Sequence, residues 1–241
     1  MPGAVVRQPG EVGQSPHGPP GSFQVLIDPA TGSERLLQRV LELPSAVSAA
    51  VGHAGAEDVL YVGRGSGVLV TGLEEVPHPV RPGSAALVPS KVPAYFVNTN
   101  DEALVVISVL SPPPFVGVFT MEVRDLPTPT VHEDDRDPLS AGEDRSFKVL
   151  IQSDHVTQFV GFIHRSKAPP HTHIYEEALY VLSGQGLVHI EASTTPIRPG
   201  TSIFLPPGTS HCLENQGLGL LKVLGVFSPP GSPADKVHQS G

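Results

Sequence analysis

Two stretches of the chain repeat one pattern, and this internal repeat constrains the fold more than any other sequence feature. Residues 22–27 resemble residues 146–151, and residues 57–67 resemble residues 176–186. An Arg-Pro-Gly turn followed by a further proline begins at residue 81 and again at residue 198, and each copy ends in Ser-Pro-Pro. Such a repeat predicts two tandem domains of the same fold.

The elements within each copy are short and are separated by turn residues. The 241 residues include 25 Gly and 27 Pro, and aromatic residues make up only 5% of the chain. Residues 156–164 are rich in β-branched and aromatic side chains, and residues 178–183 and 201–205 form further short apolar runs. Frequent turns around short apolar runs favour strands over long helices. The sequence therefore predicts an all-β fold.

The second copy gathers residue types that bind metal ions. His171 and His173 are two positions apart, so on a strand both side chains leave the same face. Glu177 follows them, and a Pro-Pro-Gly turn then delivers His211 back toward them. Three imidazoles and one carboxylate suit divalent Fe, Mn, Ni, Co or Zn. Four protein ligands around an octahedral metal leave open positions for substrate, water or dioxygen.

This spacing closely resembles the two signature motifs of the cupin superfamily. The first motif matches at His171, His173, Glu177 and Gly184, and the second at Gly200, Pro206, Gly208, His211 and Asn215. One position departs from the pattern, because Arg165 stands where the family often has glycine. The resemblance implies a bicupin, with two tandem jelly-roll β-barrels. It also implies that His171, His173, Glu177 and His211 are the metal ligands.

The first copy keeps the scaffold of the motif but lacks its imidazoles. Gly52, Ala54, Asp58 and Ala94 occupy the positions of the four expected ligands. His53 is one residue out of register, so on a strand it points to the opposite face. We therefore interpret the first barrel as metal-free, with a structural, dimerising or pocket-lining role.

The positions of the two repeat copies divide the chain into five segments. We expect a flexible N-terminal arm over residues 1–21, a first barrel over 22–111, a connector over 112–145, a second barrel with the metal site over 146–230 and a flexible tail over 231–241. The arm and the tail have few clustered apolar residues, which is typical of segments without a packed structure. The charged run at 132–137 is interpreted as a solvated part of the connector.

Further side chains are candidates for the pocket around the metal. Alternation along 156–164 places Gln158, Phe162 and His164 on one face, which we interpret as the face toward the pocket. His164 is then a candidate catalytic base beside Glu177, although an exposed or otherwise paired histidine is the simpler interpretation. Phe204 is expected to line the cavity, although core packing alone also explains it.

Two residues that follow His211 are interpreted as structural. Asn215 is expected to hold the turn around His211 rather than to contact a metal. Cys212 is expected to point away from the metal and to pack as a small apolar residue. A single cysteine excludes an intramolecular disulfide and fits a reducing cytosol.

The overall charge and hydropathy narrow the range of partners. The net charge of −9 argues against nucleic acid and anionic membranes. No apolar run approaches the roughly 20 residues of a membrane span, and the first residues lack the features of a signal peptide. We expect a cytoplasmic protein with a small-molecule substrate, and a homodimer that covers barrel edges.

Three classes of function follow from the resemblance. The first is a non-haem dioxygenase-type oxidoreductase, as in cupins that act on flavonols, diketones or aromatic acids, with Glu177 accepting a substrate proton and Fe(II) or Mn(II) favoured. The second is a non-redox hydrolase, isomerase or lyase. The layout resembles ureidoglycine aminohydrolases, whose manganese lies only in the C-terminal barrel but whose ligand types differ, and bicupin isomerases of antibiotic biosynthesis. The third is a small-molecule-binding cupin without catalysis.

Overall fold

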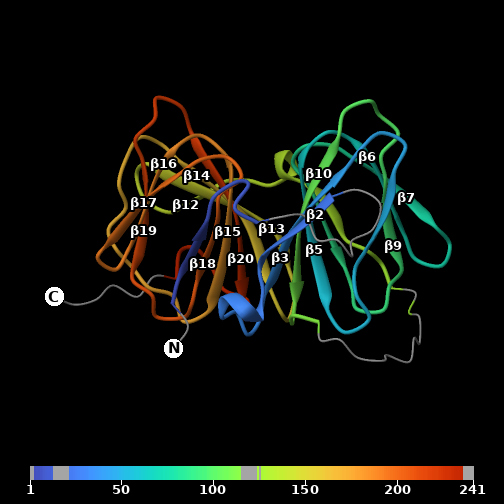
Figure 1. The fold of residues 1–241 in the computed structure, drawn as a ribbon, viewed down its shortest axis with the longest axis horizontal. Coiled ribbons are helices and arrows are strands. Elements are labelled where there is room, and N and C mark those ends of the chain that lie inside the picture. The colour runs from blue at the N-terminus through green and yellow to red at the C-terminus, as the bar shows by residue number, and fades with distance from the viewer. Residues whose placement is uncertain (1–2, 13–21, 115–123, 125, 236–241) are drawn as a thin grey trace. The chain divides into compact units, whose positions relative to one another are not determined.

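The computed structural model describes residues 3–12, 22–114, 124 and 126–235 (Figure 1). These residues form 20 strands and two single-turn 3-10 helices, η1 (Pro29–Thr31) and η2 (Glu133–Asp135). No helix in this part of the chain has the length and apolar character that crossing a membrane requires. The all-β prediction is confirmed.

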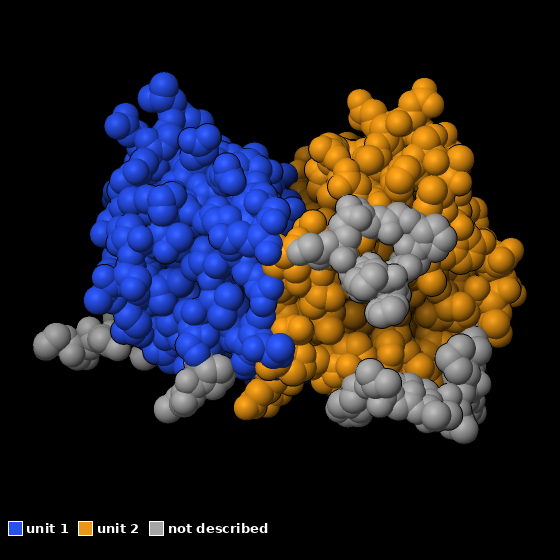
Figure 2. All heavy atoms as spheres, viewed as in Figure 1, with its two compact units in different colours: residues 1–11, 30–33, 136–241 blue, residues 12–29, 34–135 orange. Residues whose placement is uncertain are grey.

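The chain divides into two compact units (Figure 2). Unit 1 comprises residues 1–11, 30–33 and 136–241, and unit 2 comprises residues 12–29 and 34–135. The predicted repeat thus corresponds to two units, although each unit also takes in residues from outside its own copy.

Unit 2 is built from two antiparallel sheets around one apolar core. The larger sheet has the order β11-β8-β5-β10-β3-β2 and the smaller the order β4-β9-β6-β7. Their bounds are β2 (Ser22–Ile27), β3 (Leu37–Leu43), β4 (Ser48–Val51), β5 (Glu57–Arg64), β6 (Gly67–Thr71), β7 (Val76–Val80), β8 (Ser84–Val88), β9 (Ala94–Val97), β10 (Leu104–Ser111) and β11 (Thr130–His132). Leu41, Leu69 and Phe96, from both sheets, belong to one buried cluster.

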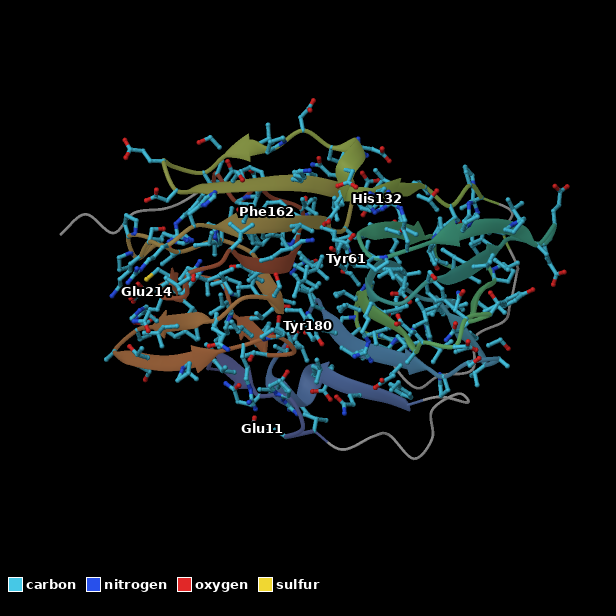
Figure 3. All side chains as sticks on the ribbon, turned by 90° about the horizontal axis from the view of Figure 1, so that it is seen from above. Glu11, Tyr61, His132, Phe162, Tyr180 and Glu214 are labelled. Carbon is cyan, nitrogen blue, oxygen red and sulfur yellow. The ribbon has the colours of Figure 1, made fainter. Side chains whose placement is uncertain are left out.

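Unit 1 repeats this arrangement and holds the predicted ligands. Its sheets have the orders β1-β18-β15-β20-β14-β13-β12 and β17-β16-β19. Their bounds are β1 (Val5–Arg7), β12 (Leu139–Ser140), β13 (Arg145–Gln152), β14 (Thr157–Ile163), β15 (Glu176–Ser183), β16 (Gly186–Ile190), β17 (Ser193–Ile197), β18 (Ser202–Leu205), β19 (His211–Asn215) and β20 (Leu221–Ser228). Figure 3 draws the side chains of the described residues on the ribbon. Leu179, Val188 and Phe227 are part of the buried core.

Three segments differ from the predicted arm, connector and first barrel. Val5 in β1 pairs with Phe204 in β18, so part of the predicted arm is an edge strand, while residues 13–21 lie outside the described residues. In unit 2, β11 pairs with β8 in the same way, although it falls in the predicted connector. Ser33 is buried in unit 1, where its hydroxyl donates a hydrogen bond of 2.7 Å to Glu176 Oε2. In each case backbone pairing or a buried hydrogen bond orders a segment that has few apolar residues.

Candidate metal centre

Backbone hydrogen bonds bring the two histidine motifs together. The amide of His171 donates to the carbonyl of His211 and the amide of His211 donates to the carbonyl of His171, each at 3.0 Å. The amide of Gly208, in the turn before β19, donates to the carbonyl of His173 at 2.8 Å. The Pro-Pro-Gly turn therefore returns the chain to the His-x-His segment, as the sequence predicts.

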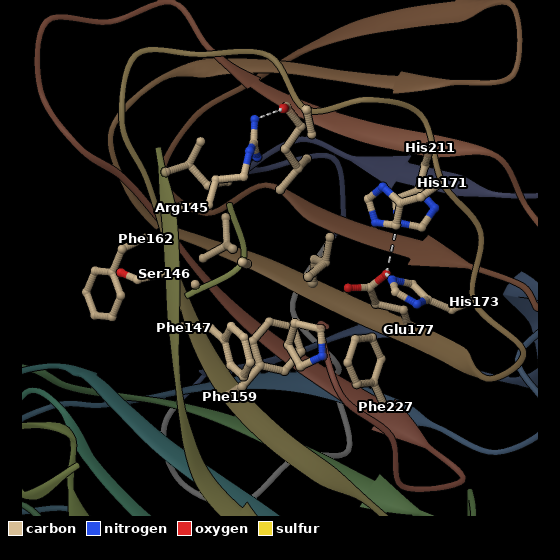
Figure 4. A pocket seen from close by; sticks show the side chains of 18 residues that line it. Arg145, Ser146, Phe147, Phe159, Phe162, His171, His173, Glu177, His211 and Phe227 are labelled. Carbon is tan, nitrogen blue, oxygen red and sulfur yellow. Dashed lines mark hydrogen bonds and ion pairs between the residues drawn. The ribbon is translucent and has the colours of Figure 1, made fainter. Parts of the chain in front are cut away.

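The three imidazoles form a compact cluster (Figure 4). One nitrogen from each of His171, His173 and His211 lies within 4.8 Å of those of the other two. The ring centroids of His171 and His211 are 4.5 Å apart, and those of His171 and His173 are 4.9 Å apart. This spacing allows all three rings to bind one cation.

Each imidazole is oriented by a backbone carbonyl at its Nδ1 atom. The acceptors are Pro169 O at 3.2 Å from His171, Asp235 O at 3.0 Å from His173 and Thr209 O at 2.9 Å from His211. A carbonyl oxygen only accepts, so Nδ1 of each ring carries the proton and Nε2 presents its lone pair. This is the arrangement that orients metal-binding histidines in proteins.

Glu177 completes the cluster. Its Oε2 atom lies 3.2 Å from His211 Nε2 and 3.9 Å from His173 Nε2. Oε2 is buried, and the contact with His211 lacks hydrogen-bond geometry, so within the described part of the chain this oxygen accepts no hydrogen bond. A buried carboxylate oxygen that faces imidazole nitrogens and lacks a donor fits a cation ligand.

The protonation of the cluster also suits a cation. Burial, together with the charge of His211, lowers the pKa of His171 to about 4. Burial alone raises the pKa of Glu177, but the adjacent His211 and the other two histidines outweigh it, so that pKa lies below its ordinary value. Near neutral pH His171 is therefore neutral and Glu177 is ionised, which are the forms that bind metal.

A cavity of about 90 Å³ lies beside the four residues. Most of its wall is apolar and comes from Phe147, Phe159, Ile163, Leu179, Val223 and Phe227. Arg145 at the start of β13 also lines it (Figure 4). Arg145 Nη2 donates to Leu213 O at 3.0 Å and to Ser166 Oγ at 3.4 Å, which fixes the guanidinium. Apart from Arg145, Ser146 and the four candidate ligands, the residues that line the cavity are apolar.

The pocket residues predicted by alternation are placed differently. Gln158, Phe204 and His164 are not among the lining residues, and His164 is exposed. Phe162 borders the cavity, but its ring lies on the side of β14 away from the histidines (Figure 4), with the Lys148 and Lys222 amines at 5.9 and 5.7 Å from the ring centroid. The assigned face is wrong because Phe159, Gly161 and Ile163 are the β14 residues that point inward.

Arg145 and Tyr175 are site residues that the sequence analysis did not select. Arg145 lies at a strand end, where alternation carries little information. Tyr175 lies between His173 and Glu177, and its ring stacks on His173 at 5.0 Å with an interplanar angle of 15°. Its position two residues after a predicted ligand was an available signal, because such residues share a face on a strand.

Cys212 is buried as predicted, whereas Asn215 has a structural role at the turn after β19 and not at the turn around His211. Asn215 Nδ2 donates to Ile163 O and Gly219 O, each at 2.8 Å. Its repeat partner Asn98 makes the equivalent pair of bonds, to Leu43 O and Glu102 O. Since the amide does the same in the copy without histidines, its role is independent of the metal. Cys212 is fully buried, and burial raises the pKa of its thiol.

In unit 2 an arginine stands against the carboxylate that corresponds to Glu177. Asp58 is fully buried, and its Oδ2 lies 3.1 Å from Arg39 Nη2 and accepts the Gly52 amide at 2.9 Å. Its Oδ1 accepts the Ser108 hydroxyl at 2.6 Å. Both oxygens of this carboxylate are paired, and Arg39 balances its charge without a bound metal ion.

Comparisons with known proteins agree with this architecture. Among curated proteins, the chain is 38% identical over 71 residues to an uncharacterized protein of Methanocaldococcus jannaschii, covering 29% of this chain and 57% of that protein. It is 37% identical over 70 residues to an oxalate-binding protein of Thermotoga maritima, covering 26% of this chain and 58% of that protein. The chain thus spans less than two thirds of the length of both relatives.

Solved structures match over nearly the whole chain at low identity. A putative glyoxylate-induced protein of Pseudomonas aeruginosa aligns with a TM-score of 0.78 and 18% identity, covering 95% of this chain and 90% of that one. Oxalate decarboxylase of Bacillus subtilis, in a study of its Mn(II) centres, aligns with a TM-score of 0.73 and 14% identity, covering 92% and 76%. At these identities the matches show the fold alone.

The family model described as "Cupin domain" matches twice, at residues 40–110 and 159–227. The two matches together cover more than half of the chain and fall one in each copy of the repeat. The protein therefore belongs to the cupin family and is a bicupin whose histidine triad lies in its second cupin domain.

Proposed function

We propose that this bicupin is a metal-dependent enzyme that acts on a small organic acid in its second domain. The observation that carries the proposal is the buried Glu177 oxygen that accepts no hydrogen bond and faces imidazole nitrogens beside a cavity. His171, His173, Glu177 and His211 hold one divalent cation, with Fe(II) or Mn(II) favoured over Ni, Co or Zn. When bound, the cation supplies Lewis acidity and, if it is redox-active, access to oxygen chemistry.

The size of the cavity supports a small substrate. Pockets for drug-sized ligands measure about 300–1,000 Å³, whereas this one measures about 90 Å³. A compound with few non-hydrogen atoms fits, and a multi-ring flavonol is too large. The apolar wall excludes water from the reacting atoms and strengthens the electrostatic contacts among the charged groups.

The chemistry of the wall supports a carboxylate. Arg145 lines the cavity, and among the described residues it uses only Nη2 for hydrogen bonds, which leaves Nε and Nη1 available for a ligand. A guanidinium pairs with a carboxylate through two parallel hydrogen bonds. In this proposal Arg145 orients the acid, and Glu177 accepts a proton from those acids that carry one. The similar proteins named for oxalate point in the same direction, so oxalate-sized acids are the first to test.

The three candidate classes of function differ in whether they consume dioxygen and in whether they form a product. Our first proposal is an oxygen-dependent oxidoreductase of the dioxygenase type. The non-redox alternative, a hydrolase, isomerase or lyase, draws support from the similarity to a decarboxylase that contains Mn(II). A binding protein without turnover draws support from the relative named for oxalate binding.

One experiment separates these classes. Protein loaded with Fe(II) or Mn(II) is titrated with oxalate, malonate and a flavonol by calorimetry, and each mixture is then assayed for products and oxygen consumption. We expect the small acids to bind only to metal-loaded protein. Product with oxygen uptake supports the oxidoreductase, product under argon supports non-redox catalysis, and tight binding without product supports a binding protein. Equal binding of oxalate to metal-free protein would contradict the proposal.

A further inference from the structure

The segment after β20 lies against the metal centre. We define residues 231–235 as the C-terminal strap. Gly231 N donates to Thr157 Oγ1 at 3.2 Å, Tyr175 OH donates to Ser232 O at 2.7 Å, and Pro233 lines the cavity. A turn closed by Asp235 N and Ser232 O at 2.9 Å ends it. This part of the predicted flexible tail is therefore ordered, because hydrogen bonds hold it to unit 1.

The strap supplies the acceptor that orients one of the three histidines. His171 and His211 each bond to the carbonyl two residues earlier, so their own turns orient them. His173 instead bonds to Asp235 O, which is 62 residues away in the sequence. Of the three rings, His173 is thus the one whose tautomer and direction depend on a distant segment.

Tyr175 couples the strap to the same imidazole. Its ring is buried, stacks on His173, and packs on Phe227 with centroids 4.4 Å apart. Its hydroxyl holds the strap at Ser232. Gly231 permits this approach, because a Cβ at that position would overlap the Tyr175 ring. The stack and the strap are therefore one packed unit around His173.

We propose that the C-terminal strap is a positioning element of the metal centre, which holds His173 for the cation and closes one wall of its cavity. This inference rests on the proposed metal site. Asp235 and Tyr175 act through His173 and do not contact the cation. Loss of an outer partner of a metal-binding histidine typically costs about 10–100-fold in metal affinity. Opening the strap also exposes the cavity at Pro233 and gives a chelator access.

The test uses full-length protein with two substitutions that act on the strap and spare the ligands. Tyr175→Phe keeps the ring on His173 but removes the hydroxyl bond to Ser232, and Gly231→Ala displaces the strap from the ring. Tyr95→Phe removes a surface hydroxyl bond in unit 2, and Gly219→Ala adds a methyl group where nothing lies within 4 Å. These two variants are matched controls.

Two measurements decide the outcome. Transfer of Mn(II) or Co(II) to a chelator is expected to be about tenfold faster from both strap variants than from the wild type and the controls. In metal-free protein, the Asp235 amide is expected to exchange hydrogen slowly in the wild type and faster in Tyr175→Phe. Equal release rates across all five proteins overturn the positioning role. If the wild type takes up no metal, the proposed function fails, and amide exchange alone decides whether the strap is closed.

Discussion

Tyr61 and Glu133 in unit 2 are joined by a hydrogen bond of 2.9 Å from the phenol to the carboxylate, and this contact anchors the end of edge strand β11. Burial, followed by the charge of Glu133, raises the pKa of Tyr61, so the phenol stays protonated and keeps donating. In unit 1 the corresponding edge is covered by β1 instead. The two copies therefore cover the same sheet edge with segments that are unrelated in sequence, β11 in unit 2 and β1 in unit 1.

Removing one imidazole should empty the metal centre. We expect His211→Ala to lower the metal content measured by elemental mass spectrometry from about one equivalent to near zero, because His211 is a proposed ligand and contacts Glu177. His189→Ala is the matched control, since His189 pairs with Glu214 at 2.7 Å and is not part of the triad. Wild-type metal content in His211→Ala would contradict the ligand set.

Arg145 should determine the affinity for small acids without affecting the metal. Hydrogen bonds to charged groups contribute about 1.5–3 kcal/mol, so Arg145→Met should weaken oxalate binding by roughly 10–100-fold in calorimetry. Metal content should stay unchanged, because Arg145 is not part of the triad. Arg165→Met, at an exposed arginine, is the control. Unchanged oxalate affinity in Arg145→Met would remove the basis for a carboxylate substrate.

The metal-free protein should lose stability as the pH falls from 6.5 toward 4. The pKa of His171 is about 4 in the folded protein, against 6.5 in the unfolded chain. The unfolded chain therefore binds the proton first, so acid favours unfolding across this window. We expect melting temperatures of the wild type to fall there, and those of His171→Gln to fall less. If the melting temperatures of both proteins fall equally with pH, the pKa of His171 is not lowered by folding.

The Arg39–Asp58 pair should stabilise unit 2 much more than a surface pair does. Removing one partner of a buried ion pair costs about 3–5 kcal/mol, and Asp58 is fully buried. Arg39→Met is expected to lower the free energy of unfolding by about 3 kcal/mol in urea denaturation. This value is at the lower end of the range because Arg39 is partly exposed. Arg64→Met breaks the exposed pair with Glu42 and should cost at most about 1 kcal/mol. Equal losses in both variants would contradict this assignment.

The sequence predicted that His171, His173, Glu177 and His211 come together, because their spacing is set by local turns. His171, His173 and Glu177 lie on one short segment, and the turn at Gly208 bonds directly to His173. These constraints act over few residues, so they can be predicted from the order and spacing of the residue types in the sequence. The two-copy architecture was predicted for the same reason, since each strand and turn recurs in order.

The face of β14 was not predictable in the same way. All of its residues except Phe162 are buried, so apolar residues occupy both faces and alternation does not identify the inner one. The strand β1 and the strap were missed because their order depends on partners far away in the sequence. β1 is short and is placed by pairing with β18 over three residues and by packing of Ala4 and Val6 on the core. The strap is placed by hydrogen bonds with the side chains of Tyr175 and His173.

Because of Arg39, the two cupin domains differ in the source of the positive charge that faces their buried carboxylate. In unit 2 the positive charge opposite the carboxylate is part of the polypeptide and is present as soon as the chain folds. In unit 1 the positive charge opposite Glu177 is, in the function proposed above, a metal ion taken up from solution. If unit 1 binds the proposed metal, removing that metal is expected to destabilise unit 1 and to leave unit 2 unchanged.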